Sequence, residues 1–288
     1  MAAISFSKIP LISAVLVFLG MTISTGRANA SAVQFGKTTE SKRATTWQPA
    51  PGTHWQIVLE DALSDTSLNV PIYDIDLFTN PMETINTLHG LNRKVIWYFS
   101  AGTYEDFRPD SKIFLPSDIG EPLANWPGEW WLDTSSPNVR KIMLDRLDLA
   151  KSKGCDGVDP DNVDGYQPEI DTGFALTTKT AIEYMSFLAD AASDRSMSIG
   201  LKNAGEIVAD VLPFVQYQVN EQCVEQQNCA DFQPFLDANK PVFNIEYPPS
   251  APKVHAKIIA KYCGDPSRAG FSTDLKEGLL TNWVYVCP

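Results

Sequence analysis

The sequence predicts an α/β protein, a single-domain (β/α)8 TIM-type barrel over residues 47–288. Short apolar runs rich in β-branched and aromatic residues alternate with amphipathic stretches of helical length, which is typical of a parallel sheet. The barrel region spans about 240 residues of uniform composition without a second linker, which suits one barrel of ordinary size. Acidic and other polar residues recur where the apolar runs end. An open doubly wound sheet is the alternative, and the lack of a G-x-G-x-x-G motif disfavours it.

The first residues indicate export. Lys8 precedes an apolar run from Ile9 to Met21, and Ala28-Asn29-Ala30 fits a small-residue cleavage site, so we expect residues 1–30 to be a secretory signal peptide. A membrane anchor is disfavoured because the run is interrupted and is shorter than the ~20 residues that a spanning helix needs. Residues 31–46 lack apolar periodicity and are expected to form a flexible leader. The mature protein is therefore expected to be secreted and extracellular.

The charge of the chain restricts its partners. The formal net charge is −12 at pH 7, and removal of residues 1–30 takes away Lys8 and Arg27 but no acid, which leaves −14. Such a surface repels nucleic acid and anionic membranes and favours cationic or neutral partners. We expect neither a nucleic-acid nor a membrane partner, and we expect a monomer.

Eight short apolar runs are the expected strands of the barrel. They are Trp55–Leu59, Pro71–Leu77, Lys94–Phe99, Gly157–Asp161, Ser198–Lys202, Phe214–Val219, Val242–Glu246 and Gly270–Thr273. Three helices have clear signals between them. One begins at Pro81 and ends at Gly90, one begins at Ser136-Pro137 and stops at Gly154, and one begins at Thr178.

The stretch Gly154–Tyr166 holds four aspartates and an asparagine within nine residues. Val158 and Val163 keep an alternation through it, so we expect a short buried strand that delivers carboxylates to a cleft, where parallel barrels hold their catalytic residues. A calcium loop is disfavoured, because counting from Asp159 puts Ile170 where a bidentate glutamate belongs. A solvated turn remains open for Asp164-Gly165.

Polar side chains at the ends of several strands should converge on one mouth. The residues expected there to bind substrate are Tyr73, Asp74, Asp76, Tyr98, Asp159, Asn162, Lys202 and Glu246. The segment Pro109–Asp133 contributes Trp131 and Asp133, and its three tryptophans are expected to form an aromatic wall or lid, with ordinary packing as the alternative for each. An aromatic surface beside carboxylates suits sugar rings and cationic groups.

The five cysteines all follow residue 30. Export and spacing predict the pairs Cys223–Cys229 and Cys263–Cys287, which leave Cys155 as a buried thiol. A zinc site is disfavoured because the chain has no C-x-x-C motif and only three histidines. We expect no metal and no organic cofactor.

Several motifs together carry a resemblance to a known family. They are Tyr73–Phe78 (YDIDLF), Tyr98–Glu105 (YFSAGTYE), Arg108–Asp110 (RPD), Trp131–Asp133 (WLD) and Gly157–Tyr166 (GVDPDNVDGY). With these motifs in order, the chain resembles glycoside hydrolase family 114, the endo-α-1,4-polygalactosaminidases and spherulin-4-like secreted proteins. The resemblance implies a TIM-type barrel, secretion, and endo-cleavage of α-1,4-linked galactosamine in the partly deacetylated galactosaminogalactan that fungi secrete.

The same resemblance implies the catalytic pair Asp161 and Glu221, with Glu246 as a competitor for the second role. Glycoside hydrolysis needs one protonated carboxyl and one ionised carboxylate, and a crowd of acids can separate its pKa values in this way. We therefore hypothesise that Asp161 is the nucleophile and Glu221 the acid/base of a retaining enzyme. The surplus acids would attract and orient the ammonium group of galactosamine.

Two other functions stay open. One is a non-catalytic carbohydrate-binding or cell-surface protein on the same barrel, and the other is an α-galactosidase-like enzyme for neutral galactosides. The presence of both acids favours an enzyme over a binding protein.

Overall fold

The structure is a computed structural model that describes residues 46–288 of the 288-residue chain. The expected signal peptide, and all of the expected leader except Thr46, lie outside the described residues. The described residues fall within one compact unit.

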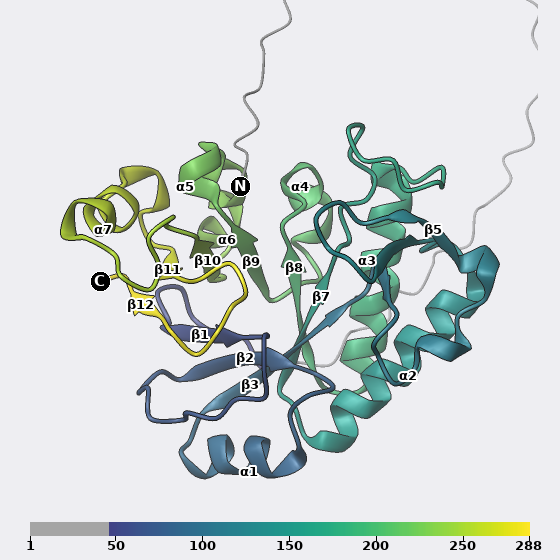
Figure 1. Cartoon of the computed structure of the whole chain (residues 1–288), viewed down its shortest axis with the longest axis horizontal. Coiled ribbons are helices and arrows are strands. Elements are labelled where there is room, and N and C mark those ends of the chain that lie inside the picture. The colour runs from purple at the N-terminus through teal and green to yellow at the C-terminus, as the bar shows by residue number, and fades with distance from the viewer. Residues whose placement is uncertain (1–45) are drawn as a thin grey trace, which may run out of the picture. The chain divides into compact units, whose positions relative to one another are not determined.

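Eight parallel strands follow one another in chain order in a curled sheet, which confirms the predicted barrel class (Figure 1). They are β1 Trp55–Val58, β2 Ile72–Asp76, β3 Lys94–Ser100, β7 Gly157–Asp161, β8 Ser198–Lys202, β9 Tyr217–Glu221, β10 Val242–Glu246 and β11 Ser272–Leu275. A short strand, β12 (Tyr285–Val286), pairs antiparallel with β11.

Two strands begin later than their apolar runs predicted. Phe214 and Val215 both donate backbone hydrogen bonds to the Val211 carbonyl, so they belong to a helical turn before β9. Gly270 has a positive φ of 86°, and the Phe271 amide bonds back to the Arg268 carbonyl, so a turn also takes the residues before β11. Because local backbone hydrogen bonds take up these residues, both strands begin after the start of their apolar runs.

The first and last parallel strands meet without a ladder of backbone hydrogen bonds within the part of the chain that the structure describes. Instead, the Trp55 indole N–H on β1 donates to the Ser272 carbonyl on β11 at 3.0 Å. A side chain therefore joins the two edges of the sheet.

The three predicted helices are present. They are α1 Met82–Gly90, α2 Pro137–Lys153 and α3 Thr178–Asp194. The Ser136 side chain accepts hydrogen bonds from the first turn of α2, and Gly154 ends that helix with a φ of 90°. The short helices are α4 Val208–Val211, α5 Cys223–Gln226, α6 Gln233–Asp237 and α7 Ala256–Cys263, with 3-10 turns η1 Ser111–Ile113, η2 Pro116–Asp118, η3 Gly205–Ile207, η4 Cys229–Phe232 and η5 Pro266–Arg268. Residues 59–71, between β1 and β2, contain no helix, so the alternation is less regular than the sequence pattern indicated.

A small antiparallel sheet is inserted between β3 and α2. Its strands are β4 Thr103–Glu105, β5 Ile119–Pro122 and β6 Glu129–Leu132, in the order β4-β6-β5. Strands β5 and β6 lie within the predicted aromatic segment Pro109–Asp133, but the tryptophans of that segment differ in exposure. Trp131 is buried and packs so closely on Gly165 that a Cβ there would lie 2.9 Å from its ring, whereas Trp126 is 51% exposed.

The core has two layers, one inside the barrel and one between the sheet and the helices. The inner layer consists of Trp55, Ile57, Ile72, Ile96, Tyr217, Val219, Phe243, Ile245 and Leu280. Because successive side chains of a strand point to opposite faces, this layer defines which other residues face inward. Asp74 on β2, Asp159 and Asp161 on β7, and Glu221 on β9 all lie on the inner side.

Both predicted disulfides are present, Cys223–Cys229 and Cys263–Cys287. Cys155 is free and buried, and burial raises the pKa of its thiol well above the ordinary range. None of the described helices is long and apolar enough to cross a membrane.

Candidate active site

Two carboxylates lie close together at the carboxyl ends of two barrel strands, β7 and β9. Asp161 ends β7 and Glu221 ends β9, and Lys202 ends β8, the strand between them. The Lys202 Nζ lies 2.9 Å from Asp161 Oδ1 and 3.2 Å from Glu221 Oε2. Since both oxygens contact the same nitrogen, they lie no farther apart than about 6 Å.

Each carboxylate has further partners. The Tyr98 hydroxyl donates to Asp161 Oδ2 at 2.9 Å. The Asn203 amide donates to Glu221 Oε2 at 3.1 Å, and the Tyr247 hydroxyl donates to Glu221 Oε1. The side chains of Asp161 and Glu221 are 15% and 27% exposed, so both are oriented by the protein and still open to solvent.

The positive charge of Lys202 affects which protonation states this cluster favours. Burial by itself lowers the pKa of Lys202, but Asp161, Glu221 and Asp159 outweigh it and hold that pKa well above the ordinary range. Burial by itself raises the pKa of Glu221, but Lys202 and the hydrogen bonds from Tyr247 and Asn203 reverse the direction and lower it. In the free protein, Lys202 therefore favours the ionised form of Glu221.

Two more acids lie deeper in the barrel. Asp74 and Asp159 are fully buried, and none of their four carboxylate oxygens has a hydrogen-bond partner among residues 46–288. Burial, with the charges of Asp161 and Glu221 against that of Lys202, raises the pKa of Asp159 to about 7. Burial and the charge of Asp159 raise the pKa of Asp74 well above its ordinary value. Because no solvent reaches either side chain, we correct their predicted role as direct substrate contacts.

Two of the predicted site residues face the wrong side of the sheet. Tyr73 packs in the outer core layer, and its hydroxyl donates to the Leu68 carbonyl at 2.8 Å. Glu246 is fully buried and accepts from the Val224 amide at 2.8 Å, at the start of α5. Strand alternation thus removes Tyr73 from the mouth, and it removes Glu246 both as a substrate contact and as a competitor for the acid/base role.

Two further acids are used by the fold. Asp76 is buried, pairs with Arg108 at 2.7 Å and accepts from the amide of Phe78. Asp133 accepts from the Ser135 amide at 2.9 Å in the turn before α2. Both carboxylates thus have partners within the protein, and the structure shows no contact between either of them and Asp161 or Glu221 among the described residues.

The remaining predicted residues lie around the pair. Asn162, directly after Asp161, has a φ of 60° and donates to Ser100 Oγ at 3.0 Å. Trp131 is buried against Gly165, four residues beyond Asp161, and supports the loop that follows β7. Together with Lys202 and Tyr98, these residues form the wall of the site rather than an open aromatic platform.

Sequence reasoning missed Tyr247 and Glu129. Tyr247 directly follows β10, and polar residues just beyond a strand are the signal that could have identified it. Glu129 lies on β6, and its carboxylate accepts from Thr103 Oγ1 at 3.0 Å. No local sequence pattern predicts that Glu129 on β6 lies beside Thr103 on β4, because this contact depends on the pairing of the inserted sheet.

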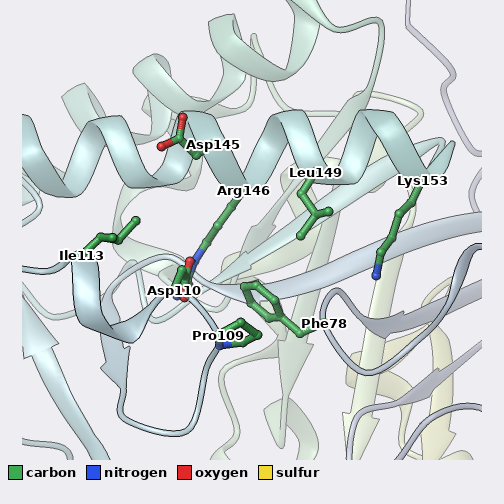
Figure 2. Close-up of a pocket in the computed structure, with 8 residues that line it drawn as sticks. All are labelled: Phe78, Pro109, Asp110, Ile113, Asp145, Arg146, Leu149 and Lys153. Atoms are coloured by element: carbon green, nitrogen blue, oxygen red, sulfur yellow. Dashed lines mark hydrogen bonds and ion pairs between the residues drawn. The ribbon is translucent and has the colours of Figure 1, made fainter.

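The end of β3 is held from outside the barrel. Arg146 reaches from α2 to Asp110, with its Nε 2.8 Å from Asp110 Oδ2 (Figure 2). The Arg146 Nη1 also donates to the Ser100 carbonyl at 2.6 Å. A hollow of about 340 Å³ lies beside this pair, lined by residues such as Phe78 and Leu149. It is separate from Asp161 and Glu221, so we regard it as part of the outer scaffold.

A TIM-type barrel that holds two carboxylates together at the carboxyl ends of its strands has the arrangement that glycosidases with two carboxylates use. Comparison with known proteins gives the family. Residues 36–288 match the sequence profile of glycoside-hydrolase family GH114, and the chain belongs to this family. It is a glycoside hydrolase.

Individual proteins also resemble this chain. The chain is 52% identical to Ega3 of Aspergillus fumigatus, solved in complex with galactosamine, with a TM-score of 0.82 over 85% of this chain and 100% of that one. The glycoside hydrolase domain of PelA from Pseudomonas aeruginosa shares the fold, with a TM-score of 0.61 and 11% identity over 80% of this chain and 97% of that one. An uncharacterised protein of Deinococcus radiodurans is 25% identical over 173 residues, which span 54% of this chain and 56% of the relative.

Proposed function

We propose that this protein is a secreted, endo-acting hydrolase of α-1,4-linked galactosamine in partly deacetylated galactosaminogalactan. The observation that carries the proposal is the pair Asp161 and Glu221, joined by Lys202 at the mouth of the barrel. The substrate class is supported by the 52% identity to Ega3, which was solved with galactosamine. Two disulfides fit an oxidising extracellular setting, as does the signal peptide expected over residues 1–30.

The distance between the carboxylates supports a retaining mechanism. Retaining enzymes hold their two carboxyl groups about 5–5.5 Å apart, whereas inverting enzymes leave about 6.5–9.5 Å for a water molecule. The shared Lys202 limits the nearer Asp161 and Glu221 oxygens to about 6 Å. Asp161 then attacks the anomeric carbon while Glu221 protonates the departing glycosidic oxygen. In the second step Glu221 takes a proton from water, whose oxygen displaces Asp161 from the sugar.

Lys202 has a different effect in each step. In the first step Glu221 must carry a proton, and a bound sugar that excludes water raises its pKa through burial, the largest influence on this group. Once Asp161 forms an ester it loses its charge, and Lys202 is left to stabilise the ionised Glu221 at 3.2 Å. This is the form of Glu221 that activates water.

The experiment is turnover of partly deacetylated galactosaminogalactan by the wild type, Asp161→Asn and Glu221→Gln. We expect short oligosaccharides from the wild type and a loss of about 100-fold or more in each variant. Asp145→Asn, on the exposed face of α2, is the matched control and should keep full activity. Binding of the polymer without cleavage by the wild type would instead identify a carbohydrate-binding protein, and cleavage of neutral galactosides alone would change the substrate class.

A further inference from the structure

Two glutamates stand directly opposite each other in the inserted sheet. Glu105 on β4 and Glu129 on β6 are cross-strand partners in an antiparallel pair. Thr103 Oγ1 donates to Glu129 Oε2 at 3.0 Å, and Thr103 lies two residues before Glu105, so both glutamates lie on the same face of the sheet. Like charges in this arrangement destabilise a sheet.

Only one of the two glutamates forms ion pairs with the described residues. Arg108 lies 2.7 Å from Glu105 Oε1, and Arg146 lies 4.0 Å from Glu105 Oε2. Glu129 makes no ion pair with any residue between 46 and 288, the range that the structure describes. Glu105 is 3% exposed, and its Oε2 has no hydrogen-bond partner in the described part of the chain. Among the described residues, cations therefore contact Glu105 but not Glu129, and Glu129 is the more open of the two.

This charge lies beside the catalytic pair. The Asn162 amide, directly after Asp161, donates to Ser100 Oγ at 3.0 Å, and Ser100 in turn contacts the Thr103 hydroxyl that holds Glu129. Burial, together with the charges of Glu105 and Asp161, raises the pKa of Glu129 to about 7, against the lowering effects of the Thr103 hydrogen bond and the Arg108 charge. A cation bound next to Asp161 would thus relieve repulsion at both Glu129 and Glu105.

We propose that Glu129 binds the ammonium group of a galactosamine residue next to Asp161 and makes the site prefer free amino sugars to N-acetylated ones. This inference rests on the proposed function. An ammonium offers three hydrogen-bond donors and a full charge to a carboxylate, and such pairs are stronger where water is partly excluded. An acetamido group is neutral and gives no such compensation. Glu129 takes over a role expected of other acids, of which Asp74 and Glu246 are fully buried and Asp76 and Asp133 make contacts within the fold.

The test is calorimetric binding of two ligand sets, α-1,4-galactosamine oligosaccharides and their fully N-acetylated forms. An Asp161→Asn background prevents turnover, so that binding is measured directly. We expect Glu129→Gln to weaken binding of the amino sugar by about tenfold and to change binding of the acetylated sugar by less than about twofold. Glu121→Gln, an exposed acid on β5 of the same sheet, is the matched control and should change neither. The melting temperature of Glu129→Gln should not fall, because the substitution removes one of two opposed charges while keeping the Thr103 acceptor.

Three results would overturn the inference. Equal weakening for both ligands would indicate a general structural role, and no weakening for either would remove Glu129 from the binding site. In the otherwise wild-type enzyme, a loss of kcat at unchanged KM on both substrates would instead make Glu129 a proton donor. The proposed function fails separately, if the wild type does not cleave the amino-sugar polymer. Failure of the wild type to bind either ligand would overturn both proposals.

Discussion

At the residue scale, the candidate site depends on a buried lysine, Lys202. The Lys202 side chain is 3% exposed and lies among Asp161, Glu221 and Asp159. Burying one ammonium among three acids is favourable only because each charge offsets the desolvation of the others. We therefore expect Lys202 to contribute both to the stability of the fold and to the reaction at Asp161 and Glu221.

Replacing this lysine should affect both stability and activity. We expect Lys202→Met to lower the free energy of unfolding by about 3 kcal/mol, because it leaves buried acids without a cation. Loss of the lysine also raises the pKa of Glu221, so the alkaline limb of the kcat/KM profile should move to higher pH. Urea unfolding and pH-rate measurements check the two effects.

The control for this variant is another lysine. Lys141→Met breaks an exposed pair with Asp145, in which the side chains are 69% and 51% exposed, and should cost less than about 0.5 kcal/mol. Equal effects of the two substitutions would mean that Lys202 is not a buried partner of the catalytic acids.

The buried Asp159 should make stability depend on pH. Its folded-state pKa of about 7 lies above the ordinary aspartate value. Its contribution is therefore least unfavourable below about pH 4, and the fold loses stability as the unfolded chain ionises between about pH 4 and pH 7. Asp159→Asn should remove this loss and gain on the order of 2–4 kcal/mol above pH 7, with little gain near pH 4. Unfolding titrations across this range check it, and a gain that does not vary with pH would contradict it.

At the element scale, the inserted sheet is joined to the barrel where β3 ends. Ala101 and Gly102 donate their amides to the Asp161 carbonyl at 2.9 and 3.1 Å. A Cβ on Gly102 would lie 1.6 Å from the Asn162 carbonyl oxygen. The inserted sheet can therefore lie this close to the end of β7 only because residue 102 has no side chain.

Gly102→Ala should consequently displace the backbone that carries Asp161. A shift of about 1 Å in a catalytic group costs on the order of 100-fold in rate, and we expect a fall in kcat/KM of that order. The matched control is Gly90→Ala at the end of α1, where an added Cβ meets nothing within 4 Å. Steady-state kinetics on both variants decide the prediction, and full activity in Gly102→Ala would refute it.

At the scale of the whole molecule, a disulfide holds the last strand against the barrel. Cys263, at the end of α7, is joined to Cys287, which directly follows β12, across 24 residues. β12 pairs with β11 and so covers an edge of the sheet. The bond therefore secures the C-terminal part of the barrel, away from β7, β8 and β9.

Removing this bond should lower stability while sparing activity. We expect Cys263→Ser with Cys287→Ser to lower the free energy of unfolding by about 3 kcal/mol, and kcat/KM at low temperature to stay within about twofold. Removal of Cys223–Cys229, which begins two residues after Glu221, should lower kcat/KM as well. Thermal unfolding and kinetics on the two pairs test the contrast, and equal loss of activity in both would contradict it.

The sequence by itself determined the parts of this protein that depend on neighbours along the chain. The bounds of β7, β8 and β10 follow their apolar runs, and α2 is capped by Ser136 and Gly154 as predicted, because capping is local. Cysteine spacing predicted both disulfides. The five motifs between Tyr73 and Tyr166, taken together and in order, were enough to predict the family.

Only the tertiary structure decided which polar residues share the mouth. The strands of a parallel barrel are buried on both faces, so an apolar run does not reveal which residues point inward. Tyr73 and Glu246 were assigned to the mouth and face outward, one residue out of step with Asp74 and Ile245. Glu129 reaches the proposed site through the pairing of β4 with β6, two strands that are well separated in the sequence. Lys202 on β8 contacts Asp161 on β7 and Glu221 on β9, the two neighbouring strands. Such contacts depend on how separate segments pack, and no local pattern contains them.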